Sequence, residues 1–213
     1  MDELDAIQYE KIAAEQKAFA RVLEAYLPTG VYSNPRILNL FCGAVVEEPV
    51  IFRHFGSGTS MTSIDKSREM GDIAQRLGMK TFIHGDINTL EDHDDGVYDI
   101  VLMRNPPIVS NDANILFSEW YALLEKLPNF MHQDGILFMT LLNSHEYRIV
   151  VPAIPRIGYR RFRVRENSVE VPSSALNDQC PFGKDTYILV AQKPNFVSKF
   201  SRFLSKDISL KFL

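Results

Sequence analysis

Three short apolar segments of the sequence are each followed by a residue that could contact a ligand: Gly43, Asp65 and Asp86. A carboxylate in the position of Asp65 can accept hydrogen bonds from both hydroxyls of a ribose. A glycine in the position of Gly43 lets the backbone approach a ligand closely, because it has no Cβ. A fourth apolar segment ends at an Asn-Pro-Pro sequence that begins with Asn105. Together these residues indicate a candidate ligand-binding site.

The alternation of apolar segments with helical patterns predicts the elements that position these residues. Strands are expected at 36–41, 59–64, 80–83, 98–103, 136–142, 159–165 and 186–192. Helices are expected from 12 to 27, 47 to 55, 66 to 77, 111 to 127 and onward from 143. The fold class is therefore α/β: a doubly wound, mostly parallel seven-stranded sheet with an antiparallel closing strand pair and helices on both faces. In such a sheet, ligands bind at the carboxyl ends of the strands.

Local signals refine the later elements. Asn143 followed by Glu146 three residues on predicts a capping box at a helix start. Pro152 and Pro155 are expected to keep that helix short or kinked. An Asp-Gly pair at 134–135 predicts a turn before the strand at 136–142.

The order of these strand-end residues resembles the class I S-adenosylmethionine-dependent methyltransferases, a Rossmann-like family, over residues 31–192. The resemblance implies that S-adenosylmethionine is the cofactor and that Asp65 holds its ribose. It implies that Asp86 accepts the adenine amino group and that the backbone N–H of Ile87 meets a ring nitrogen. The cofactor-binding residues that it implies are Asn39, Phe41, Gly43, Asp65, Lys66, Asp86, Ile87 and Arg104.

The turn after the first strand departs from the family pattern, which has an acid near its start and three glycines. Asn39 stands at the acid position, and Phe41 and Val45 stand at two of the glycine positions. Phe41 and Val45 are expected to crowd a close backbone approach. Asn39 cannot neutralise the positive charges of the cofactor, so we expect Glu47 or Glu48, just past the turn, to substitute for the missing acid.

The Asn-Pro-Pro sequence resembles the loop of amino-methylating family members, which implies that Asn105 and Pro106 are catalytic. There the Asn side chain and a Pro carbonyl accept hydrogen bonds from the substrate amino group and orient its lone pair along the methyl–sulfur axis. Proximity and this alignment accelerate the methyl transfer. Those enzymes have an aromatic residue next, which stacks on the substrate. Ile108 occupies that place here, which disfavours a flat nucleobase or glutamine acceptor.

Simpler structural roles compete with these assignments. Asp65 could cap the helix that follows it, and Asp86 could be an ordinary turn residue. Asn105 could be a turn residue that precedes proline. The occurrence of all three in the right order favours the ligand-binding interpretation.

Composition limits the function classes. The 213-residue chain has a formal net charge of −4, which argues against general nucleic-acid binding. Only two cysteines are present, and the five histidines have no metal-ligand spacing, so no disulfide framework and no metal site are expected. The N-terminal residues are acidic and lack an apolar signal core. We expect a cytoplasmic protein.

Charge is unevenly distributed along the chain. Arg161, Arg163 and Arg165 alternate with apolar residues, which predicts either an anion-binding face or, more commonly, a solvated or ion-paired one. The domain boundaries expected are a helix in 1–30 that packs on the domain, a methyltransferase-like domain at 31–193 and a basic amphipathic helix at 194–213. We expect the last helix to dock on the domain or on a partner, with contact to an anionic membrane surface as the alternative.

The function that these patterns favour is methyl transfer from S-adenosylmethionine to an unidentified small-molecule acceptor, at an amino nitrogen. The alternative is a catalytically inactive methyltransferase-like module that binds a partner, which the two lost glycines and the lost acid suggest. A nicotinamide dehydrogenase is disfavoured because no G-x-G-x-x-G sequence follows the first strand. The sequence makes no prediction about oligomeric state.

Overall fold

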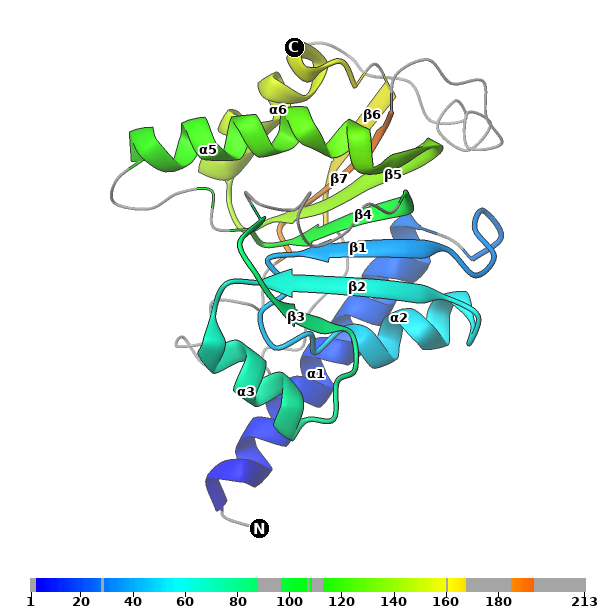
Figure 1. The fold of residues 1–213 in the computed structure, drawn as a ribbon, viewed down its shortest axis with the longest axis vertical. Helices are drawn as coiled ribbons and strands as arrows, with labels where there is room; N and C mark the ends of the chain where they lie inside the picture. The colour runs from blue at the N-terminus through cyan, green and yellow to red at the C-terminus, as the bar shows by residue number, and fades with distance from the viewer. Residues whose placement is uncertain are drawn as a thin grey trace.

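The computed structural model describes residues 3–27, 29–87, 97–106, 108, 113–159, 161–167 and 185–193. Its centre is a seven-stranded sheet in the order β3-β2-β1-β4-β5-β7-β6 (Figure 1). The strands are β1 (Arg36–Leu40), β2 (Ser60–Asp65), β3 (Phe82–His84), β4 (Tyr98–Arg104), β5 (Met131–Leu141), β6 (Arg161–Glu166) and β7 (Tyr187–Gln192). The first five are parallel, and β7 pairs antiparallel with both β5 and β6. The predicted sheet and its antiparallel closing pair are confirmed.

The helices cover both faces of this sheet. They are α1 (Glu3–Tyr26), α2 (Glu48–Phe55), α3 (Arg68–Arg76), α5 (Ala113–Lys126) and α6 (Ser144–Ile157), with a short 3₁₀ helix at Leu127–Phe130. One apolar cluster joins α1 and α2 to one face of the sheet, and another joins α5 and α6 to the opposite face. Alternate residues of one strand serve the two clusters: Ile37 faces α1 and α2, and Leu38 faces α5 and α6. Both residues are buried, as expected for a doubly covered parallel sheet.

The third strand begins later than predicted, at Phe82 rather than at residue 80. The reason is the buried carboxylate of Glu48, which accepts hydrogen bonds from the backbone N–H groups of Lys80 and Thr81 at 3.0 to 3.1 Å. It also accepts one from Thr81 Oγ1 at 2.7 Å. These bonds hold the segment before the strand against α2.

The predicted turn at 134–135 is wrong, because β5 begins at Met131 and runs through these residues. The pairing of β4 with β5 shifts between Tyr98 and Ile100, so the Asp-Gly pair lies in a bulge of the strand. Met131 is 1% exposed and pairs with Tyr98, and this burial extends the strand toward its N-terminus.

Helix α6 has the predicted start, but of the two effects predicted for its prolines, a short or a kinked helix, shortening is not observed. The Asn143 side chain accepts hydrogen bonds from the backbone N–H groups of His145 and Glu146, and Glu146 Oε2 accepts one from Leu142 N. The helix then continues through Pro152 and Pro155 to Ile157. Its buried face on the sheet stabilises it despite the two missing donors.

The predicted helix at 194–213 and most of the connection between β6 and β7 lie outside the described residues. Within the part of the chain that is described, no helix has both the length and the apolar character needed to cross a membrane.

Candidate active site

A cavity of about 480 Å³ lies at the carboxyl ends of β1, β2, β3 and β4, where the sequence predicted a ligand site. The predicted residues that line it are Phe41, Gly43, Asp65, Lys66, Asp86, Ile87, Arg104 and Asn105. Asn39 and Pro106 are buried and do not line it. Helices α1 and α5 add wall residues that sequence reasoning missed, among them Glu15, Glu119 and Trp120.

The turn after β1 has a left-handed backbone at the three positions where the resembled family has glycine. The φ angles are +56° at Phe41, +52° at Gly43 and +56° at Val45. Two L-residues with side chains therefore hold a conformation that costs roughly 1–2 kcal/mol each, and for a β-branched valine it is rare. The backbone path of a glycine-rich turn is present although two of its glycines are not.

The side chains of Phe41 and Val45 point to different places, so the expected crowding applies to Phe41 alone. Val45 is fully buried and packs with Cys42 and Ala74 of α3, and it does not line the cavity. Phe41 does line it. Burial raises the pKa of the Cys42 thiol, and the nearby Glu47 and Asp65 carboxylates raise it further, which disfavours the nucleophilic thiolate.

Asp65 connects the turn after β1 with the start of α3. Its Oδ2 accepts a hydrogen bond from Gly43 N and its Oδ1 accepts one from Ser67 N, both at 2.9 Å. The N-cap of α3 is Ser67, whose Oγ accepts from Met70 N at 3.3 Å, so the capping role predicted as the alternative for Asp65 belongs to Ser67. Each carboxylate oxygen of Asp65 has capacity for a further donor from the cavity.

The end of β3 contributes the opposite side of the cavity. Asp86 is exposed, and Ile87 is 7% exposed. Lys66, next to Asp65, is also exposed at the cavity rim. On this side of the cavity, Ile87 is therefore an apolar wall residue, and Asp86 and Lys66 are charged residues that a ligand could contact.

Glu47 supplies a carboxylate at the position where Asn39 lacks one. Asn39 Nδ2 donates a hydrogen bond to Glu47 Oε1 at 2.6 Å, and Glu47 is 3% exposed and lines the cavity. Burial raises the pKa of Glu47, although Arg104 and Asn39 act in the opposite direction. Glu48 does not line the cavity, because its carboxylate binds the segment before β3.

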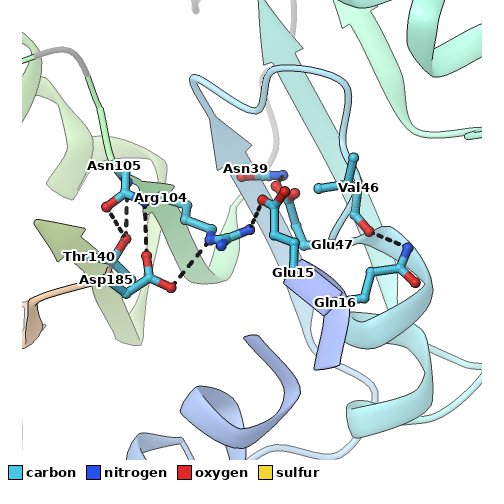
Figure 2. A network of polar contacts seen from close by, with 9 residues as sticks. All are labelled: Glu15, Gln16, Asn39, Val46, Glu47, Arg104, Asn105, Thr140 and Asp185. Atoms are coloured by element: carbon cyan, nitrogen blue, oxygen red, sulfur yellow. Dashed lines mark hydrogen bonds and ion pairs between the residues drawn. The ribbon is translucent and has the colours of Figure 1, made fainter. Parts of the chain in front are cut away.

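Arg104 is the centre of a buried polar network that joins three distant parts of the chain (Figure 2). Its Nη1 contacts Glu15 Oε1 of α1 at 2.5 Å, and its Nε lies 3.5 Å from Asp185 Oδ2, just before β7. Its guanidinium also stacks over the Phe19 ring, 4.9 Å from the ring centre. Burial lowers the pKa of Arg104, but the carboxylates of Asp185, Glu15 and Glu47 outweigh it, so Arg104 is a permanent cation.

The same network fixes the loop after β4. Asn105 has φ of +46°, its Nδ2 donates to Asp185 Oδ1 and its Oδ1 accepts from Thr140 Oγ1, both at 3.0 Å. The carbonyl of Pro106 accepts a hydrogen bond from Ile108 N at 2.8 Å. These contacts fix Asn105, which lies at the cavity wall.

Helix α1 also contacts the turn after β1 directly. Gln16 Nε2 donates to the carbonyl oxygen of Val46 at 2.7 Å, as Figure 2 shows. Together with the contact between Glu15 and Arg104, this bond holds the N-terminal helix against the cavity.

No sequence signal marked Glu15 or Asp185, because their partner, Arg104, lies 89 and 81 positions away, respectively.

No protein-family model matches the sequence, and no curated protein matches it. Among solved structures, the plantazolicin methyltransferase BpumL, crystallised with a triazolic desmethylPZN analog and SAH, is similar at 15% identity and a TM-score of 0.61, covering 90% of this chain and 91% of that one. The plantazolicin methyltransferase BamL is similar at 11% identity and a TM-score of 0.62, with 92% of both chains covered. A SAM-dependent O-methyltransferase from Thermotoga maritima is similar at 15% identity and a TM-score of 0.57, covering 86% of this chain and 66% of that one.

These likenesses establish the fold, which is that of the class I S-adenosylmethionine-dependent methyltransferases. The predicted fold resemblance is confirmed.

Proposed function

We propose that this chain transfers a methyl group from S-adenosylmethionine to an amino nitrogen of a small-molecule acceptor. The observation that carries the proposal is the left-handed backbone at Phe41, Gly43 and Val45. This strained turn borders a cavity at the carboxyl ends of four parallel strands. Strain of this kind persists only where the surrounding structure imposes it, and it concentrates at ligand sites.

The cavity chemistry fits this cofactor. S-adenosylmethionine, when bound, supplies an electrophilic methyl group on a positively charged sulfur and also carries an ammonium group. Glu47, Glu15, Asp65 and Asp86 line the cavity, against Lys66 and Arg104. Arg104 is paired with Glu15 and Asp185, so Glu47, Asp65 and Asp86 outnumber Lys66 and favour a cationic ligand.

Each residue then has a role that its position supports. Asp65 would bind the ribose hydroxyls, and Asp86 with the backbone of Ile87 would bind the adenine. The backbone of Gly43 would approach the methionine end, with Glu47 in place of the acid missing at Asn39.

The acceptor side is the wall at Asn105. Its Oδ1 accepts one hydrogen bond, from Thr140, and retains a second lone pair for an amino N–H. Ile108 is 1% exposed and packed in the core, so nothing from this position stacks on a flat acceptor. These features favour a non-aromatic amine, held so that its lone pair is aligned with the transferred methyl group.

A second candidate is a methyltransferase-like module that no longer catalyses. The contacts within the loop after β4 favour it: both polar ends of the Asn105 amide and the Pro106 carbonyl already have partners within the chain. Phe41 in the turn also reduces the space for a cofactor backbone contact.

A methyl-transfer assay separates the two candidates. The chain is incubated with methyl-labelled S-adenosylmethionine and a panel of aliphatic amines, with alcohols and carboxylic acids of matched size as comparison acceptors. We expect label in the amines only. The Asn105→Gly variant keeps a residue that tolerates positive φ and should lose turnover while it retains cofactor affinity within about threefold. Label in none of the acceptors, with intact cofactor binding, would favour the inactive module.

A further inference from the structure

We propose that the indole N–H of Trp120 donates a hydrogen bond to the nucleoside half of the bound cofactor. The proposal rests on the proposed function and adds to it a binding residue on α5. Neither the sequence pattern nor the family resemblance assigned Trp120 a role other than packing.

Trp120 is the only tryptophan of the chain. It lines the cavity at the carboxyl ends of the strands and is 5% exposed. Its Nε1 is shielded from solvent, and within the described part of the structure this atom has no hydrogen-bond partner. The side chain therefore presents a buried donor without an acceptor, in the wall of a ligand cavity.

A buried donor of this kind is unfavourable unless something satisfies it. Buried tryptophan N–H groups usually have a partner, and a leucine or phenylalanine would fill the same place in the apolar cluster without an unpaired polar atom. The indole is therefore best explained by an acceptor that arrives with the ligand.

The surroundings of Trp120 indicate which end of the ligand it meets. Trp120 and Ile87 belong to the same apolar cluster and line the same cavity. Ile87 follows Asp86 at the end of β3, where the adenine is proposed to bind. The charged groups of the cavity wall near β1 and β4 lie elsewhere: Arg104 pairs with Glu15 of α1 and stacks over Phe19 of the other apolar cluster, and Glu47 bonds to Asn39.

Donor and acceptor chemistry at this end are complementary. Adenine carries one amino donor and several ring-nitrogen acceptors. Asp86 can accept only, and the indole can donate only. A carboxylate for the amino group and an indole N–H for a ring nitrogen would distinguish adenine from a base with the reverse pattern.

The first test uses Trp120→Phe, which removes the N–H and keeps an aromatic ring, and S-adenosylhomocysteine as the probe. We expect the dissociation constant to rise about three- to tenfold. Phe130→Leu is the matched control, because Phe130 lies in the same cluster, is 7% exposed and does not line the cavity. It should leave the dissociation constant unchanged.

The second test needs no variant. The single tryptophan gives one indole ¹H–¹⁵N resonance, and we expect its proton to shift downfield when S-adenosylhomocysteine or adenosine saturates the wild-type chain. This spectrum decides the matter if Trp120→Phe does not fold.

The outcomes are distinguishable. Wild-type binding that Trp120→Phe leaves unchanged, or an indole proton that does not move on saturation, would overturn this inference and leave the proposed function intact. Failure of the folded wild-type chain to bind S-adenosylhomocysteine would overturn both.

Discussion

Asn39 Nδ2 donates a hydrogen bond to Glu47 Oε1 across 2.6 Å inside the protein. The two residues stand eight positions apart, at the end of β1 and at the N-cap of α2. The pair places a carboxylate beside the turn where the strand-end residue itself lacks one. The sequence predicted that either Glu47 or Glu48 would fill this place, and the structure puts only Glu47 at the cavity.

Substitution of the two neighbouring glutamates should separate binding from stability. We expect Glu47→Gln to weaken S-adenosylmethionine binding about tenfold, because it removes the buried charge that faces the cationic ligand. Glu48→Gln should leave affinity unchanged but lower the free energy of unfolding by about 1–3 kcal/mol, since Glu48 accepts backbone hydrogen bonds at Lys80 and Thr81. Calorimetric titration and denaturant unfolding of both variants measure the two effects. The reverse pattern would contradict the assignment.

Cofactor binding should depend on pH. Burial raises the pKa of Glu47 in the free protein, and a bound cation favours the ionised form, which lowers that pKa. Binding therefore releases protons, and affinity should rise with pH between the lower pKa that Glu47 has in the complex and the raised pKa that it has in the free protein. Calorimetry in two buffers of different ionisation enthalpy counts the protons. In Glu47→Gln this proton release should fall, and a wild-type affinity that fell with rising pH would refute the explanation.

The strained turn gives a prediction about Phe41. Phe41→Gly relieves a left-handed backbone that costs roughly 1–2 kcal/mol and widens the cavity wall. We expect cofactor affinity to increase severalfold. As the counterpart, Gly43→Ala should destabilise the protein by about 1 kcal/mol through backbone strain alone, because a Cβ at Gly43 meets nothing within 4 Å. Thermal unfolding and titration of both variants test this, and an Ala at 43 that costs nothing would contradict the left-handed backbone.

Removal of Arg104 should be severely destabilising. Arg104→Ala leaves the buried Asp185 and the partly buried Glu15 without their cation, and breaking a buried pair costs about 3–5 kcal/mol. Arg53→Ala, on the exposed side of α2, is the matched control and should change the free energy of unfolding by less than about 0.5 kcal/mol. Urea unfolding compares them, and similar losses in both variants would show that the network contributes nothing.

The local pattern of apolar residues was sufficient to predict the strands and helices of the sheet and the residues at the strand ends. Asp65, Asp86 and Asn105 reach one cavity because parallel strands end at one edge of the sheet. The bulge at 134–135 could not be predicted, because an Asp-Gly pair suits both a turn and a bulge, and only the pairing of β5 with β4 distinguishes the two.

The polar network around Arg104 could not be predicted for a different reason. Glu15 and Asp185 come from opposite ends of the described chain, and their pairing depends on how α1 and β7 pack against β4. The indole of Trp120, which has no hydrogen-bond partner among the described residues, was equally hidden, because in the sequence it is one apolar position of a helical pattern. Sequence periodicity reports which face is buried, but not which polar atom lacks a partner.

We propose that S-adenosylmethionine binds in this cavity through Asp65. The most direct measurement is calorimetric titration of the purified chain with S-adenosylmethionine and S-adenosylhomocysteine, repeated on Asp65→Ala and on Asp72→Ala, an exposed acid of α3 outside the cavity. We expect both ligands to bind to the wild type and to Asp72→Ala, and affinity to be lost in an Asp65→Ala variant shown to be folded. No binding by the folded wild type, or equal affinity in Asp65→Ala, would contradict it.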